Sequence, residues 1–117
     1  MRKIEQQMLD AIRDKRDWKC ANTQVICAHF PHSDQPIDRV TVVLHGSPIA
    51  IITPDHVDAS DCGYQTPTTK SRLNAVLREF CGAGIYQKNR EWFAYAEGEQ
   101  DWPVPPRSRQ LFYRGES

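Results

Sequence analysis

The sequence lacks the features that would place the protein in a membrane or on a secretory route. No stretch approaches the roughly 18 consecutive apolar residues that a membrane-spanning helix needs, because polar or charged residues interrupt every apolar run. Near the N-terminus, Asp10 directly follows Met8 and Leu9, so the apolar core of a signal peptide is absent. We therefore expect the protein to stay in the cytoplasm in which it is made.

Signatures of metal, nucleotide and disulfide sites are missing as well. The chain has four cysteines and four histidines, but it has no Cys-x-x-Cys pair and no recurring ligand spacing of the kind that zinc sites use. No glycine-rich phosphate-binding loop is present. The sequence therefore predicts no metal, no cofactor and four free thiols, namely Cys20, Cys27, Cys62 and Cys81.

An excess of charge of either sign is also absent. The 15 Lys and Arg residues balance the 15 Asp and Glu residues, which gives a formal net charge of zero. This balance argues against a strongly basic nucleic-acid-binding surface and against an acidic mimic of DNA, although it allows a local patch. With 117 residues, of which 39% are hydrophobic, the chain has the length and composition of one globular domain.

No catalytic motif stands out. A nucleophilic pair of Cys62 with His45 or His56 remains open, but four cysteines and four histidines allow such pairs by chance, and no local motif supports one. The acidic residues of the polar stretch 54–63 are interpreted as part of a solvated surface connection. We therefore predict that the protein is not an enzyme.

What is present is, first, a helical pattern at the N-terminus. Residues 2–17 contain good helix formers and no Pro or Gly. Ile4, Met8 and Ile12 recur every four residues, while charged residues such as Glu5 occupy the other faces. The pattern predicts an amphipathic helix with one buried stripe.

A second helix is predicted to begin near Thr66. Pro67 suits the first turn of a helix, and a threonine hydroxyl can cap it. The following apolar residues keep the spacing of one helical face, and they are Leu73, Val76, Leu77 and Phe80. Gly82 or Gly84 is expected to end this helix.

Five runs rich in β-branched or aromatic residues predict strands over residues 24–30, 40–45, 49–53, 85–87 and 91–96. Gly46-Ser47-Pro48 joins the second run to the third, and Lys88-Asn89-Arg90 joins the last two, so each pair predicts a hairpin. Residues 31–39 are predicted to form a loop. The order of elements predicts an α+β fold, an antiparallel sheet of about five strands with two helices packed on one face.

The composition changes near the C-terminus. We predict a single α+β domain over residues 1–98 and a proline-rich, basic extension over residues 99–117. Prolines in the stretch 102–106 argue against a central strand there. The extension either lies across the domain as a clasp that hides Trp102, or projects as an arm that binds a partner.

Two groups of residues are candidate binding sites. The start of the second helix could bind an anion or a partner, because its hydroxyls and cations meet the free N–H groups of a helix terminus: Thr68, Thr69, Lys70, Ser71 and Arg72. The alternative is a well-capped helix with a solvated basic face. Possible nucleic-acid contacts, with aromatic residues beside them for stacking, are Arg107, Arg109 and Arg114.

Neighbouring aromatic residues on a strand point to opposite faces, so at least one of Trp92 and Phe93 is expected in the core.

One stretch of the sequence is similar to a known group of proteins. The stretch Gln65-Thr66-Pro67-Thr68-Thr69-Lys70-Ser71-Arg72-Leu73-Asn74-Ala75 follows Leu44-His45-Gly46, and Asn22-Thr23-Gln24-Val25 leads into the first strand. These motifs resemble those of short uncharacterised proteins encoded by tailed bacteriophages, over about residues 2–95. The resemblance implies a phage origin, a small accessory role in the cytoplasm of the host cell, and no particular chemistry.

Together these observations give two functional hypotheses. The first is a small non-enzymatic accessory protein that binds a host or phage protein. The alternative is a nucleic-acid-binding accessory protein that uses the basic helix start at 68–72 and the Arg-rich C-terminus.

Overall fold

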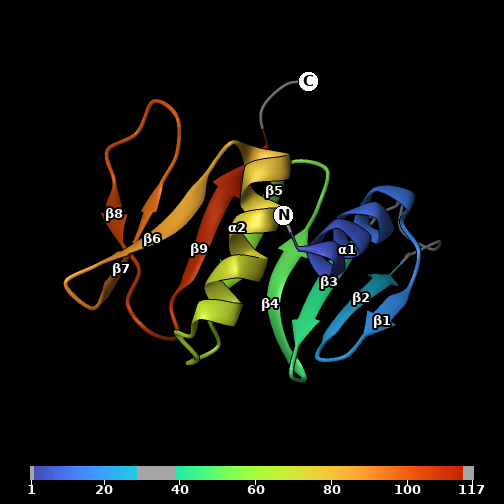
Figure 1. The fold of residues 1–117 in the computed structure, drawn as a ribbon. Helices are drawn as coiled ribbons and strands as arrows, with labels where there is room; N and C mark the ends of the chain where they lie inside the picture. Colours follow the sequence, from blue (N-terminus) through green and yellow to red (C-terminus); the bar gives the residue numbers. More distant parts are fainter. Residues whose placement is uncertain (1, 29–38, 115–117) are drawn as a thin grey trace.

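Two helices lie on one face of an antiparallel sheet in the computed structural model, which describes residues 2–28 and 39–114 (Figure 1). The helices are α1 (Lys3–Asp14) and α2 (Pro67–Cys81). The strands are β1 (Trp18–Cys20), β2 (Thr23–Ala28), β3 (Arg39–Leu44), β4 (Ser47–Ile52), β5 (His56–Ser60), β6 (Gly84–Lys88), β7 (Glu91–Tyr95), β8 (Trp102–Pro103) and β9 (Arg109–Tyr113).

The strands form two sheets rather than the single sheet predicted. The main sheet has six strands in the order β1-β2-β3-β4-β5-β9, and the small sheet has three in the order β6-β7-β8. Every pairing is antiparallel. The predicted α+β class, with an antiparallel sheet and two helices on one face, is confirmed, and the six strands of the main sheet roughly agree with the predicted five. The division into two sheets was not predicted.

Helix α1 is shorter than predicted, because the chain leaves the helical conformation at Lys15. This residue has a left-handed backbone with φ of 51°, and its N–H donates to the carbonyls of Ala11 and Ile12. The chain then turns into β1, a short strand that the sequence did not indicate. Trp18 opens this strand and packs against the core.

Helix α2 begins and ends as predicted. Thr66 is its N-cap, and the hydroxyl oxygen of Thr66 accepts a hydrogen bond from the Thr69 N–H, at 3.2 Å. Pro67 is the first helical residue, and Gly82 ends the helix with a left-handed φ of 59° that glycine adopts without strain. The predicted stripe is buried, with Leu73, Val76 and Leu77 inside the core.

The first predicted hairpin is confirmed as β3 and β4. Its turn is His45-Gly46, and both residues have positive φ, as expected for a tight two-residue hairpin turn. The pairing shifts by one residue between Val42 and Val43, which marks a bulge. Val42 and Leu44 point into the core, and Val43 between them points away.

The predicted surface connection over residues 54–63 is wrong, because its central part is strand β5. Val57 and Ala59 alternate with polar residues and are buried, so the stretch does follow a period of two. This strand is hard to predict from the sequence, because only two apolar residues follow the period of two and turn-forming residues surround them. β5 lies between β4 and β9 and so occupies an interior position of the main sheet.

The second predicted hairpin is confirmed as β6 and β7 but forms part of the small sheet. β8 pairs with β7 at the edge, a position where the missing N–H of Pro103 is tolerated. Residues 102–113, predicted as an extension beyond the domain, contribute a strand to each sheet, because β9 pairs with β5. Residues 29–38, which include most of the predicted loop and the end of the first predicted strand, lie outside the described residues.

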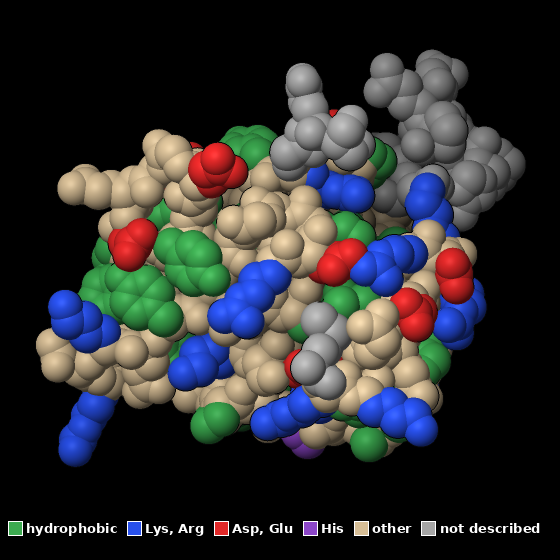
Figure 2. Space-filling view, turned by 45° about the horizontal axis from the view of Figure 1, so that its top comes forward, with side chains coloured by type: hydrophobic (Ala, Val, Ile, Leu, Met, Phe, Trp, Pro, Cys, Tyr) green, Lys and Arg blue, Asp and Glu red, His purple; other side chains and the backbone are tan. Residues whose placement is uncertain are grey.

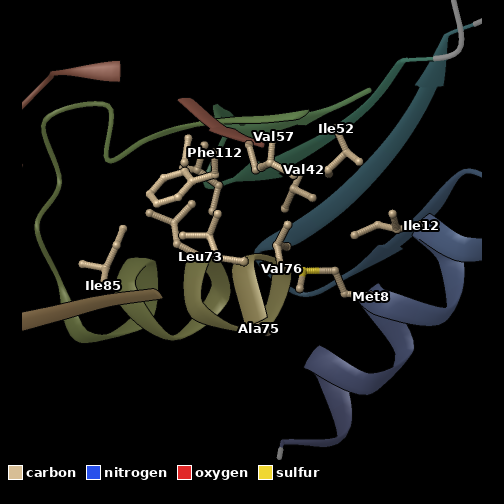
Figure 3. Close-up of a cluster of buried hydrophobic side chains, with 14 of the residues drawn as sticks. Met8, Ile12, Val42, Ile52, Val57, Leu73, Ala75, Val76, Ile85 and Phe112 are labelled. Carbon is tan, nitrogen blue, oxygen red and sulfur yellow. The ribbon is translucent and has the colours of Figure 1, made fainter. Parts of the chain in front are cut away.

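The core lies between the helices and the main sheet (Figure 3). Met8 and Ile12 come from α1, and Leu73 and Val76 come from α2. These side chains meet aliphatic and aromatic residues of the sheet, namely Val42, Ile52, Val57 and Phe112. Because the helices cover one face of the sheet only, the opposite face is left for other contacts.

Candidate functional site

The outer face of the main sheet, the side away from both helices, is a candidate binding surface. Strand register aligns one row of residues across five neighbouring strands on this side: Ile26, Thr41, Ile51, Asp58 and Leu111. Tyr113 lies on the same side of β9 as Leu111, because alternate residues of a strand share a face. We use the name outer face for these residues together with Val43.

The outer face exposes large apolar side chains to solvent. Ile26 is 40% exposed, Leu111 47% and Tyr113 69%. An ion pair lies among them, with Arg109 Nε 3.2 Å from both carboxylate oxygens of Asp58. The helix side differs, because Figure 2 shows Lys and Arg side chains there interspersed with Asp and Glu. An apolar surface with a charged pair beside it has the composition of a protein contact.

The predicted site at the start of α2 is not assembled as one surface. Thr69 is buried, and its side chain lies within hydrogen-bond distance of the Thr66 hydroxyl, at 3.0 Å. Ser71 and Arg72 both turn toward α1, whereas Thr68 and Lys70 are half-buried. The five residues therefore do not converge on a common ligand position.

Arg72 belongs to a buried polar network instead. Its Nη1 lies 2.7 Å from Glu5 Oε2, and its Nε donates to the Thr23 hydroxyl at 3.0 Å. The Ser71 hydroxyl donates to the same Glu5 oxygen at 2.5 Å. Helical spacing placed Glu5 on a solvated face of α1, but the carboxylate is buried because α2 packs against that face. The network joins α1, α2 and β2.

The three C-terminal arginines are separated by their partners. Arg109 pairs with Asp58 on the outer face. The guanidinium of Arg114 lies 5.2 Å from the centre of the Phe80 ring and donates to the carbonyl of Thr53. Arg107 is exposed, and its backbone N–H donates to Asp61. No single strip of arginines forms along β9.

A second exposed surface covers the small sheet, and we name its three rings, Tyr86, Phe93 and Tyr95, the aromatic face. The centre of the Tyr86 ring lies 5.6 Å from that of Phe93 and 6.3 Å from that of Tyr95. Figure 2 shows hydrophobic side chains gathered over this sheet, at the left. Trp92 is buried while Phe93 is partly exposed, so the prediction that one of the two lies in the core is confirmed.

Charge beside the aromatic face does not favour phosphate. The Tyr86 hydroxyl donates to Asp101 at 2.7 Å, and this hydrogen bond raises the pKa of Tyr86 above its ordinary value. Between residues 84 and 103 there are two basic and four acidic residues, namely Lys88, Arg90, Glu91, Glu97, Glu99 and Asp101. Stacking rings are present, but the cations that hold a nucleic-acid backbone are outnumbered.

All four cysteines are free in the structure. The thiol of Cys62, one member of the nucleophilic pair left open by the sequence, donates to the Pro48 carbonyl at 3.3 Å. The ring of His56 lies beside Thr53, and that of His45 beside Asn22. Among residues 2–28 and 39–114, no group of three or more His, Cys, Asp or Glu residues is placed to hold a metal ion.

Cys81 is expected to resist alkylation in the folded protein. Burial raises the pKa of its thiol from 9.0 to about 11, with Arg114 lowering it slightly. The thiolate is the reactive form, so two pH units predict a roughly hundredfold lower thiolate fraction at pH 8 than in the unfolded chain. Labelling with iodoacetamide, with and without urea, followed by mass spectrometry, measures the ratio.

Exposed Cys20 is the internal control in that experiment, because its access to reagent changes little on unfolding. Equal labelling of Cys81 with and without urea would contradict the prediction. The raised pKa also links this thiol to stability. The unfolded chain loses the proton first, so the contribution of Cys81 to stability is lost as the pH rises from about 9 towards 11.

Comparison with known proteins gives one match. The model of a protein family described as Kyanoviridae Gp96 protein matches residues 1–115. No curated protein and no solved structure matches the chain. In the part of the chain that the structure describes, no helix is long and apolar enough to cross a membrane.

Proposed function

Because the chain belongs to the Kyanoviridae Gp96 protein family, a family of phage proteins, we propose that it is a non-enzymatic accessory protein that binds a host or phage protein. The outer face of the main sheet is the contact surface in this proposal. The observation that supports it is the exposure of the apolar side chains of Ile26, Leu111 and Tyr113. They lie on the face of the main sheet that neither helix covers (Figure 1).

The composition of the outer face favours a protein partner. Isoleucine, leucine and tyrosine side chains gain from burial against another apolar surface, about 25 cal/mol for each Å² removed from water. Tyr113 supplies a large ring with a polar end, which is a common contact in protein interfaces. The Asp58–Arg109 pair lies among these side chains and can orient a partner by its charges.

The nucleic-acid alternative has less support from the geometry. Arg72 is held by Glu5 inside the protein, and Arg109 is neutralised by Asp58. Salt-dependent binding to nucleic acid requires several cations that are free to approach phosphates. Among the predicted C-terminal contacts, Arg107 is exposed and outside the ion pair of Arg109, but a single such cation gives little support for binding to nucleic acid.

The outer face is tested by replacing two of its exposed side chains. We expect Ile26→Ser together with Leu111→Ser to lower capture of the partner from nuclease-treated, infected host cells by at least about thirtyfold, as for the loss of an interface hot spot of about 2 kcal/mol. Quantitative mass spectrometry of the captured proteins measures the change. Both side chains are exposed, so the thermal midpoint should stay near that of the wild type.

Arg78→Ser is the matched control, because Arg78 is exposed on α2, on the other side of the sheet. The control variant should capture the partner as the wild type does. Equal capture by the double variant would contradict the outer face as the contact. A dimer of this chain that the double variant abolishes would identify a second copy as the occupant, and nuclease-sensitive capture would favour nucleic acid.

A further inference from the structure

The aromatic face of the small sheet points to solvent. Its rings share one side of the hairpin, because Tyr86 of β6 pairs in register with Phe93 of β7, and Tyr95 lies two residues further along β7. Ile85 and Ala94 lie on the opposite side and are buried in the core. The three rings are partly exposed, and Figure 2 shows hydrophobic side chains at the surface over this sheet. None of the three rings belongs to the outer face, so a ligand here would be independent of the proposed function.

The three rings are held in fixed positions. The Tyr86 and Phe93 rings are stacked, with an angle of 21° between their planes. The Tyr86 hydroxyl is fixed by its hydrogen bond to Asp101. The Tyr95 ring lies against the backbone of Gly84, where a Cβ would collide with it. Because the rings are positioned before a ligand arrives, binding to them requires little loss of conformational entropy.

The charge around the rings is negative, although the chain as a whole is neutral. Of the two basic residues between positions 84 and 103, Lys88 pairs in register with Glu91, and Arg90 lies in the turn at the other end of the hairpin from the β7–β8 loop. That loop contains three exposed acidic residues, namely Glu97, Glu99 and Asp101. Figure 2 shows acidic side chains next to the hydrophobic ones over this sheet. A ligand of the aromatic face is therefore expected to be cationic.

Aromatic rings beside carboxylates suit a guanidinium group. The face of a ring attracts a cation, and a planar guanidinium also stacks on it, whereas an ammonium group is more strongly hydrated and has no plane to stack. This contact already occurs within the protein, where the guanidinium of Arg114 lies 5.2 Å from the centre of the Phe80 ring. A carboxylate accepts several hydrogen bonds, so Asp101 can hold the Tyr86 hydroxyl and also accept from a guanidinium.

We propose that the aromatic face binds an arginine side chain of a partner protein, with the guanidinium group against the rings and hydrogen-bonded to Asp101. The acidic side chains of the β7–β8 loop attract the basic segment to which this arginine belongs, and they speed its association at low salt. A nucleic-acid backbone is repelled by the same carboxylates. The aromatic face is thus a second protein contact, separate from the outer face.

Short peptides test the chemistry of this contact. The full-length protein, labelled with ¹⁵N, is titrated with three blocked peptides that differ only in two side chains, which are arginine, lysine or citrulline, the uncharged analogue of arginine. We expect saturable shifts at the amides of Tyr86, Phe93 and Tyr95. The arginine peptide should bind about tenfold more tightly than the citrulline peptide, because only the charged group is attracted by both the rings and the carboxylates. It should bind about threefold more tightly than the lysine peptide, because only guanidinium stacks.

Absence of saturable shifts, or equal binding of the arginine and citrulline peptides, would overturn the proposal. A lysine peptide that binds as tightly as the arginine peptide would overturn the choice of arginine. A single-stranded oligothymidylate that shifts the same amides and binds more tightly than the arginine peptide would identify nucleic acid as the ligand instead. None of these results would affect the outer face, which is tested by capture of a partner.

Two variants with matched controls locate the binding. Tyr86→Leu removes the ring that contacts both others, and Asp101→Asn removes a charge but keeps an acceptor for the Tyr86 hydroxyl. Each should weaken binding of the arginine peptide about threefold or more. Tyr113→Leu and Asp58→Asn make the same changes on the outer face, and both should bind as the wild type does. Undiminished binding by either Tyr86→Leu or Asp101→Asn would overturn the proposal.

Discussion

Arg72→Ala is expected to lower the free energy of unfolding by about 3–5 kcal/mol, because it leaves the buried carboxylate of Glu5 without its cation. Both side chains of this ion pair are almost fully buried, at 5% and 6% exposure. The total stability of a domain of this size is about 5–15 kcal/mol, so the variant should unfold at a much lower urea concentration. Equilibrium unfolding followed by circular dichroism measures the loss.

A double variant separates the ion pair from general packing at the same place. Glu5→Leu with Arg72→Met replaces both charges by apolar side chains of similar length, and such replacements are often close to neutral. We expect it to regain most of the lost stability. Arg13→Ala removes two exposed ion pairs, with Asp10 and with Glu79, and should cost less than about 1 kcal/mol. A loss in Arg72→Ala no greater than in Arg13→Ala would show that the buried network contributes little.

The second large effect is expected at Phe112, in the segment that the sequence indicated as an extension. Phe112 is 2% exposed, pairs with Val57 in the main sheet, and has its ring centre 5.5 Å from that of Trp102. Phe112→Ala should lower the free energy of unfolding by about 3–5 kcal/mol, because it leaves a cavity in the core. An arm that projects into solvent would produce no such loss.

Leu111→Ala is the matched control for this prediction. Leu111 precedes Phe112 on the same strand but points to the outer face, where it is exposed. We expect it to cost less than about 1 kcal/mol. If both variants unfold at the urea concentration of the wild type, β9 does not contribute to the core in solution.

The candidate sites show where interpretation of the sequence reached its limit. The hydroxyls and cations at 68–72 were recognisable as a helix start, and Thr66 does cap that helix. Whether Arg72 faced solvent or Glu5 depended on the packing of α1 against α2, and no local pattern contains that information. The burial of Asp61 was equally hard to predict, because its neighbours in the chain are polar and suggested a solvated loop.

Both helices and both hairpins can be predicted from the amino-acid sequence alone, because each depends on periodicity and turn residues within a short stretch. Pro67 and Gly82 mark the ends of α2 for the same local reason. The remaining features depend on contacts between distant parts of the chain. β5 and β9 are 49 residues apart at their nearest ends and become a pair only when the chain folds back. Long-range pairing also buried Asp61 and left the outer face uncovered, because burial depends on which surfaces meet in space.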